Sequence, residues 1–153
     1  MNESRCLVVG TDGSEPAGRA VDFAIEQAVE RNLKLILATI VDWPSGMLFP
    51  EAAPVAPALD AEWFERAENE MMASARAKIL DREAEKVEKA GVAVEAVVTF
   101  GSPSRELREL AETRNAEGIV VGRHGQGVLH LPIFGGVASS LVQGATCPIY
   151  VVP

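Results

Sequence analysis

The sequence predicts an α/β fold in which a parallel β-sheet is covered by helices on both faces. Five short β-rich runs alternate with four stretches of helical periodicity, an order typical of parallel sheets built from strand–helix units. The first run, Cys6-Leu7-Val8-Val9, is continuously apolar, as expected of a central strand buried on both faces. Because crossovers between parallel strands are right-handed, the helices divide between the two faces. We therefore expect a doubly wound, five-stranded sheet.

The first strand leads into a helix with a well-marked start. Ser14 is placed to cap this helix and Pro16 falls in its first turn, where each residue type is favoured. A second apolar run, from Leu35 to Val41, predicts the second strand. Between them, small apolar residues recur at helical spacing: Ala17, Ala20, Val21, Ala24, Ala28 and Val29.

Residues 43–59 are predicted to form a long loop. The segment contains four prolines and Gly46 and has no periodicity, which is typical of an irregular connection. Long loops in compact domains are often functional, so one interpretation is a lid or a partner surface. The alternative interpretation is a mobile surface loop.

A long charged helix is expected over residues 60–90. Asp60 is a candidate cap, and Gly91 follows the helix as its terminating residue, a position that favours glycine. The interleaved Glu, Arg and Lys residues are expected to form a solvated face with ion pairs four residues apart. The predicted buried face consists of Trp63, Phe64, Ala67, Met71, Ala75, Ile79 and Val87.

The C-terminal part of the chain repeats the strand–helix order. A valine-rich run predicts a third strand over Val92–Phe100, and Gly101-Ser102-Pro103 begins the next helix. Ile119–Val121 and Ile149–Val152 are the fourth and fifth strands, with a helical pattern between them.

The glycines that follow the fourth strand suit a phosphate ligand. Gly122 ends the strand, and Gly125, Gly127 and the pair Gly135-Gly136 precede the last helix. Glycine lets a ligand approach the backbone, and free N–H groups at a helix start point toward an anion. The spacing matches neither GxxxxGK[ST] nor a GxGxxG after the first strand. On spacing alone, a tight structural connection is an equally good interpretation.

The charge and composition of the chain exclude several classes of partner. A net charge of −8 argues against nonspecific binding to nucleic acid or to an anionic membrane. The 153 residues predict one domain, residues 1–153. Neither a secretory signal nor an apolar run of the ~20 residues needed for a membrane helix is recognised, so we expect a cytoplasmic protein without membrane insertion. Cys6 and Cys147 are the only cysteines and predict neither a disulfide framework nor a zinc site.

Three linked segments resemble the universal stress protein family. Gly122-Arg123-His124-Gly125, a nine-residue interval and Gly135-Gly136 are similar to the family's ATP-binding pattern G-x-x-G, nine residues, G-[ST]. The opening CLVVGTDGSEPAGRAVDFAIEQA and the ending ATCPIYVVP are similar to the family's first strand–helix unit and last strand. The resemblance covers nearly the whole chain except residues 43–59. It implies a fold like that of adenine nucleotide alpha-hydrolases, with strand order 3-2-1-4-5 and a site at the carboxyl ends of strands 1 and 4.

The resemblance also implies a binding site for ATP, with Mg²⁺ carried by the nucleotide. In the family, the residue matching Asp12 lies by the nucleotide, where it could hold a ribose hydroxyl or a metal–phosphate group. The alternative role of Asp12, which the resemblance makes the less favoured one, is an Asx turn within Thr11-Asp12-Gly13-Ser14. The backbone of Val41 matches a position that meets adenine. The residues at matching positions are Gly10, Thr11, Asp12, Val41, Val121, Gly122, Arg123, His124, Gly125, Gly135, Gly136 and Val137.

Gly136 departs from the family pattern. Nucleotide-binding members usually carry Ser or Thr here, where the hydroxyl meets a phosphate. Losing one hydrogen bond to a charged group costs roughly 1.5–3 kcal/mol, or roughly tenfold to a hundredfold in affinity. The departure therefore predicts weakened nucleotide binding.

The resemblance implies a nucleotide-binding regulatory protein that signals in the stress response through an unidentified protein partner. It also implies a homodimer that pairs residues 149–152 of two subunits, because an apolar edge strand needs covering. The alternatives are a nucleotide-independent dimeric interaction module, which Gly136 favours, and a slow ATPase. No catalytic set is recognised in the sequence, so weak ATP hydrolysis is the most that we expect.

Overall fold

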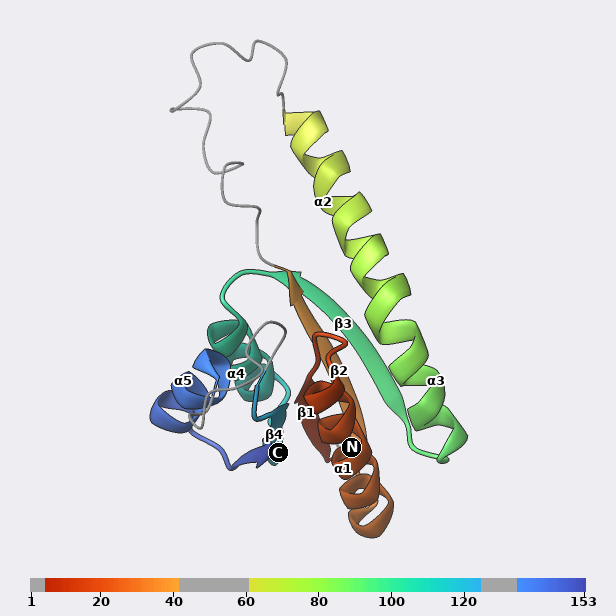
Figure 1. Ribbon diagram of the computed structural model, residues 1–153, viewed down its shortest axis with the longest axis vertical. Coiled ribbons are helices and arrows are strands. Elements are labelled where there is room, and N and C mark those ends of the chain that lie inside the picture. Colours follow the sequence, from red (N-terminus) through yellow and green to blue (C-terminus); the bar gives the residue numbers. More distant parts are fainter. Residues whose placement is uncertain (1–4, 42–60, 125–134) are drawn as a thin grey trace.

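The computed structural model describes residues 5–41, 61–124 and 135–153, which form a five-stranded sheet with helices on both faces (Figure 1). The strand order is β3-β2-β1-β4-β5 and every neighbouring pair is parallel. This confirms the predicted fold class and strand order. The strands are β1 (Cys6–Gly10), β2 (Lys34–Val41), β3 (Val94–Phe100), β4 (Ile119–Gly122) and β5 (Ile149–Val152).

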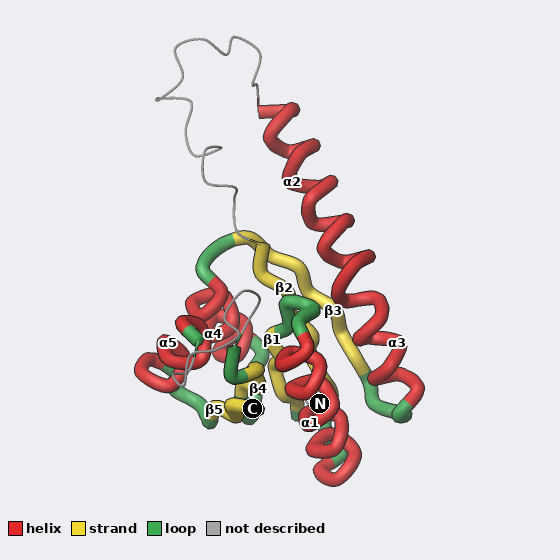
Figure 2. The backbone as a smooth tube through the Cα atoms, in the orientation of Figure 1, coloured by secondary structure: helices red, strands yellow, loops and turns green. Residues whose placement is uncertain are grey.

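One long helical rod replaces the single α-helix expected over residues 60–90 (Figure 2). It contains a π-helical turn at its centre, and Asp60, its candidate cap, lies outside the described residues. The helical elements are α1 (Glu15–Arg31), α2 (Ala61–Ala75), the π-helical η2 (Arg76–Leu80), α3 (Asp81–Lys89), α4 (Pro103–Thr113) and α5 (Gly136–Gly144).

The sheet separates two apolar layers. On one face, Leu7 of β1 belongs to a cluster with α1 and with Val87 of α3. On the other, the next residue, Val8, belongs to a cluster with Leu107 of α4 and Leu141 of α5. This alternation follows from the two-residue period of a strand. Both faces are buried, as the continuous apolar run of the first strand predicts.

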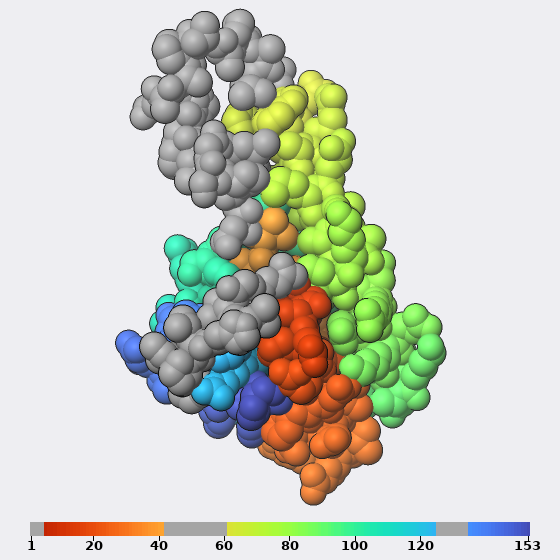
Figure 3. Space-filling model, viewed as in Figure 1, coloured from red at the N-terminus to blue at the C-terminus, as the bar shows by residue number. Residues whose placement is uncertain are grey.

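The first part of the rod, α2, buries none of its residues, which corrects the expected buried face. Figure 3 shows α2, in yellow, extending beyond the sheet at one end of the molecule. Trp63 and Met71 are only half-buried, whereas Leu80 and Val87 are fully buried where the rod reaches the sheet. Helical periodicity shows which residues share a face but not whether another element covers that face. For the same reason Val29, which shares the helical spacing of the apolar residues of α1, is nevertheless 60% exposed.

The predicted helix ends are confirmed at two positions. Ser14 caps α1, since its Oγ accepts a hydrogen bond from the Ala17 N–H at 3.3 Å. Gly91 follows α3 with φ of +77°, a left-handed conformation in which glycine is unstrained. Cys6 and Cys147 are free thiols. None of the described helices is long and apolar enough to span a membrane.

Candidate functional site

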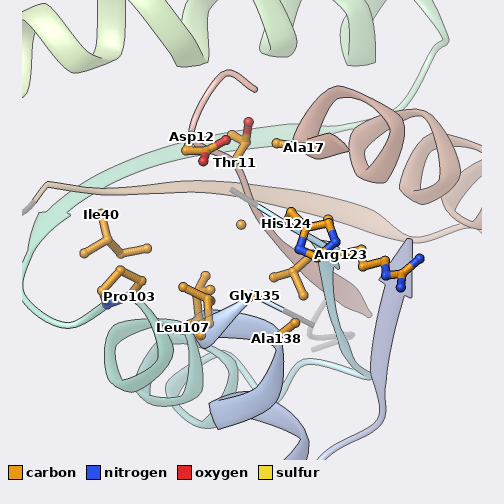
Figure 4. Close-up of a pocket in the computed structure, with 15 residues that line it drawn as sticks. Thr11, Asp12, Ala17, Ile40, Pro103, Leu107, Arg123, His124, Gly135 and Ala138 are labelled. Carbon is orange, nitrogen blue, oxygen red and sulfur yellow. The ribbon is translucent and has the colours of Figure 1, made fainter. Parts of the chain in front are cut away.

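A cavity of about 380 Å³ opens at the carboxyl ends of β1 and β4 (Figure 4). This edge is the topological switch point of the sheet, because β2 and β4 lie on opposite sides of β1. Parallel sheets bind ligands at such points. The cavity walls come from the loop after β1, the ends of β2 and β4, and the first turns of α4 and α5.

The structure brings ten of the twelve site residues together, although they are far apart in the sequence. Gly125 lies outside the described residues, and Val41 is not in the lining. The ten that line the cavity are Gly10, Thr11, Asp12, Val121, Gly122, Arg123, His124, Gly135, Gly136 and Val137.

Ile40 takes the place in the lining that Val41 was expected to occupy. Ile40 packs in the same layer as Ile36 and Ala38 of β2, and alternate residues of a strand share a face. Val41 therefore faces the opposite side, where it lines a separate hollow beside α2 and η2. Its carbonyl oxygen accepts a hydrogen bond from the Gly101 N–H at 3.3 Å.

The loop after β1 is held in place by its own hydrogen bonds. The Thr11 N–H donates to the Ala38 carbonyl oxygen at 2.9 Å, and the Thr39 hydroxyl donates to the Thr11 carbonyl oxygen at 2.8 Å. Oδ1 of Asp12 accepts from the Ser14 N–H at 2.9 Å, which is the Asx turn that the sequence predicts. Asp12 thus makes the turn and also lines the cavity. A carboxylate in a braced turn is pre-organised for a polar ligand.

Two glycines allow the ends of β1 and β4 to lie close to neighbouring helices. A Cβ at Gly122 would lie 2.8 Å from the carbonyl carbon of Pro16, so β4 reaches α1 only because this side chain is absent. A Cβ at Gly10 would lie 2.9 Å from Cδ1 of Leu107. Gly136 differs, because a Cβ there would meet no atom within 4 Å among the described residues.

The start of α5 presents its backbone at the cavity. Gly135 occupies the N-cap position, where it offers no side chain to the helix. Its own N–H donates to the Arg123 carbonyl oxygen at 2.8 Å, which joins the two described ends of the glycine loop. The N–H groups of Gly136, Val137 and Ala138 lie in the first turn and have no acceptor within the helix. Together with the helix dipole they form a positive site for an anion.

Charged side chains are few in this lining. Asp12, Arg123 and His124 are its only ionisable groups among the described residues. The Arg123 guanidinium points toward β5 in Figure 4, and the His124 ring lies on the cavity side. Nδ1 of His124 is buried without a hydrogen-bond partner in the described part of the chain. No three His, Cys, Asp or Glu side chains gather as metal ligands within residues 5–41, 61–124 and 135–153.

The apolar wall of the cavity was not predicted from the sequence. Ile40, Pro103 and Leu107 lie together at the end of the cavity away from His124 (Figure 4). Two-residue alternation along β2, counted from Ile36, would have identified Ile40. Pro103 and Leu107 gave no comparable signal, because their place at the cavity depends on how α4 packs on the sheet.

Comparison with known proteins gives a family match over almost the whole chain. The model of the universal stress protein family matches residues 4–153. Universal stress protein Rv2005c of Mycobacterium tuberculosis is 30% identical over 151 residues, which cover 95% of this chain and 47% of that protein. The chain spans about half the length of the mycobacterial relatives it matches. Universal stress protein YxiE of Bacillus subtilis is 25% identical over 146 residues, covering 95% of this chain and 97% of that protein.

Solved structures of similar fold include nucleotide complexes. A universal stress protein in complex with cAMP is 29% identical, with a TM-score of 0.66 and 99% coverage of each chain. The protein MJ0577 gives a TM-score of 0.78 at 22% identity, covering 98% of this chain and 96% of its own. A universal stress protein from Archaeoglobus fulgidus in complex with dAMP gives 0.59 at 20% identity, with 100% coverage of each chain. The last two share the fold with this chain.

Proposed function

Because the chain belongs to the universal stress protein family, we propose that it is an adenine-nucleotide-binding regulatory protein of the stress response. The observation that carries this proposal is the cavity at the switch point, which combines an apolar wall with the start of α5. The protein acts through a protein partner that senses whether the cavity is filled. We place it in the cytoplasm as a single domain over residues 1–153.

Each part of an adenine nucleotide has a matching part of the cavity. Ile40, Pro103 and Leu107 provide apolar contacts for the base. Asp12 is placed to accept a hydrogen bond from a ribose hydroxyl, since a carboxylate is an acceptor only. The N–H groups at the start of α5 take a phosphate. The complexes of similar proteins with cAMP and dAMP support this class of ligand.

The glycine loop resembles the family's ATP-binding pattern, so ATP with Mg²⁺ is the specific ligand that we propose. Asp12 is the only carboxylate in the lining among the described residues. Mg²⁺ at nucleotide sites is usually held by one or two carboxylates together with the phosphates, so with this ligand Asp12 would hold the ion in place of a ribose hydroxyl. When bound, Mg²⁺ neutralises phosphate charge. The protein residues bind and orient the nucleotide, and weak hydrolysis is the most that we assign to them.

The test is to denature freshly purified protein and identify the released small molecules by chromatography and mass spectrometry. We expect an adenine nucleotide in near-stoichiometric amount, or binding heat when AMP, ADP or ATP is titrated into the emptied protein. Asp12→Ala should weaken binding, and Asp12→Asn should weaken it less, because the amide oxygen keeps the turn and the acceptor. A protein that is purified empty and binds none of the three nucleotides would instead be a nucleotide-independent interaction module.

We also propose that two copies form a dimer through β5. This strand lies at one edge of the sheet, with β4 on its other side. Its residues, Ile149–Val152, are apolar and half-buried. An apolar edge strand is prone to pair with another strand, and pairing with its own copy gives a closed two-fold dimer.

A further inference from the structure

We propose that the π-helical turn η2 couples the nucleotide cavity to helix α2, so that a filled cavity sets the direction in which α2 presents its faces. This inference rests on the proposed function and adds to it how occupancy of the cavity is passed to another part of the molecule. The contact that carries it joins Ile79 of η2 to Gly13 of the loop after β1.

The loop after β1 has the cavity on one side and the helical rod on the other. Thr11 and Asp12 line the cavity. Asp12 and Gly13 line the separate hollow beside α2 and η2. The Gly13 N–H donates to the Thr11 hydroxyl oxygen at 3.3 Å, which joins the two sides of the loop. A ligand that holds Thr11 and Asp12 therefore also fixes the position of Gly13.

Ile79 rests directly against this loop. A Cβ at Gly13 would lie 3.3 Å from Cγ1 and 3.7 Å from Cγ2 of Ile79, so the Ile79 side chain fills the space beside Gly13. The next residue, Leu80, is fully buried in the apolar layer that contains Leu35 and Leu37 of β2. Two neighbouring side chains thus anchor η2 at two places, the loop and the sheet.

The π-helical turn gives the rod a second possible arrangement. The Asp81 N–H donates to the Arg76 carbonyl oxygen, which is one residue further back than in an α-helix. The backbone of Ala75 and Asp81, on either side, is α-helical. Conversion of this turn to regular α-helix would rotate α2 about its axis relative to α3 by roughly one residue step, about 100°. Such turns are rare and are frequent at functional sites.

A filled cavity favours the π-helical arrangement, because it holds Gly13 where Ile79 rests. In this arrangement Trp63 and Met71 of α2 line the hollow, and the rotation would turn them away from it. Coupling between two sites needs an element whose equilibrium both sites bias. The ligand acts on η2 through Gly13, and a protein partner acts on it through α2, which extends beyond the sheet (Figure 1).

The test is hydrogen–deuterium exchange by mass spectrometry on the full chain, with and without whichever of AMP, ADP and ATP binds most tightly by calorimetry. We expect the ligand to slow amide exchange over residues 76–81 by about fivefold or more, the lower end of typical coupling between sites. Exchange over residues 83–89 of α3 should change by less than about twofold. Binding without slower exchange in η2 overturns this inference and leaves the proposed function intact. Binding of none of the three nucleotides overturns the proposed function, and this inference with it.

A substitution of Ile79 tests the contact itself. Ile79→Ala should remove the effect of the ligand on η2, and by reciprocity nucleotide affinity should fall about fivefold. Arg76→Ala is the matched control, since Arg76 belongs to the same turn but is exposed and lines neither the cavity nor the hollow. It should keep both the protection and the affinity. Full protection of η2 by the ligand in Ile79→Ala would overturn the inference.

Deletion of Ala77 tests the turn without removing the contact. Ala77 is exposed, and its loss takes the extra residue out of η2, so the rod becomes a continuous α-helix that needs no support from the loop. The ligand should still bind by calorimetry, but it should no longer slow exchange in the rod. Protection equal to that of the wild type would show that η2 is not the coupling element.

Discussion

The two ends of the parallel sheet differ in their charged side chains: the amino ends carry ion pairs, and the carboxyl ends carry few charges. At the amino ends of the strands, Glu117 pairs with Arg5 and Arg31. Nearby, Glu95 pairs with Lys34 at 2.8 Å and with Arg114. At the carboxyl ends, the described lining of the cavity holds one carboxylate and is otherwise built from backbone and apolar side chains.

This difference shows why the charge-rich end is not the candidate site. Hydrogen bonds from Lys34 and Arg114 hold the pKa of Glu95 below its ordinary value, and the hydrogen bond from Arg5 does the same for Glu117. These carboxylates already have cationic partners, so they brace the strand starts. At the other end, the first N–H groups of α5 have no acceptor within their own helix, so they remain available for an anion as far as the described residues show.

The largest expected effect at the carboxyl end comes from restoring the missing hydroxyl. Gly136→Ser adds a donor at the start of α5, where a Cβ meets no described atom within 4 Å. A hydrogen bond to a charged group contributes about 1.5–3 kcal/mol, so nucleotide affinity should rise roughly tenfold to a hundredfold. Calorimetry on the variant and on the control Gly18→Ser measures the change. An unchanged affinity would show that the phosphate lies away from α5.

A second change tests the close packing of the carboxyl end. Gly122→Ala forces a methyl group to within 2.8 Å of the Pro16 backbone, so the free energy of unfolding should fall by about 1–3 kcal/mol and nucleotide binding should weaken. Chemical denaturation gives the stability. Gly18→Ala, in open space within α1, should instead raise it by about 0.5–1 kcal/mol. If both variants gain stability, the contact between Gly122 and Pro16 does not limit the packing.

Several elements could be predicted because their signals are local. Ser14 caps α1 through a bond to the Ala17 N–H three residues on, and β5 occupies the predicted residues Ile149–Val152. Gly91 adopts the positive φ that its place after a helix predicts. Each of these depends on neighbours within a few residues, so the sequence carries enough information.

Other features depend on contacts between distant segments, and prediction failed there. The apolar face of α2 looks like a core face in the sequence, but no described element covers it fully. Leu80, fully buried, was missed because its burial depends on where the rod meets the sheet. Pro103 and Leu107 reach the cavity only through the packing of α4. The family resemblance gathered the glycine loops into one site, which spacing alone did not require.

The edge strand β5 allows a test of the dimer that leaves the sheet intact. The carbonyl oxygens of Pro148 and Val152 accept hydrogen bonds from the N–H groups of Ile119, in β4, and of Arg123, just after it. The backbone groups of Val151 therefore point to the open edge. Val151→Pro should therefore weaken the dimer by about 1–3 kcal/mol, the loss of two hydrogen bonds across the two-fold axis. Sedimentation measures the dissociation constant. The control Tyr150→Pro removes an N–H directed at β4, so it should mainly lower thermal stability. A wild-type chain that sediments as a monomer at micromolar concentration would contradict the proposed dimer.

The smallest effect is expected at the amino end. Because the pKa values of Glu95 and Glu117 are lowered in the folded chain, their pairs stabilise it above the ordinary Glu pKa of about 4.3. That contribution is lost as the pH falls through the lowered values. The double variant Glu95→Gln/Glu117→Gln should be less stable than wild type by about 1 kcal/mol or less per pair at pH 7, and the difference should vanish in acid. A difference that does not change with pH would show that the charges are not its cause.

The most direct test of the account is amide chemical-shift mapping by NMR as AMP is titrated into the protein. We expect the largest shifts at the N–H groups of Gly136, Val137 and Ala138 and in the loop at Thr11, with little change around Lys34 and Arg114. Shifts concentrated at the amino ends of the strands, or absent throughout, would contradict the assignment of nucleotide binding to the carboxyl end of the sheet.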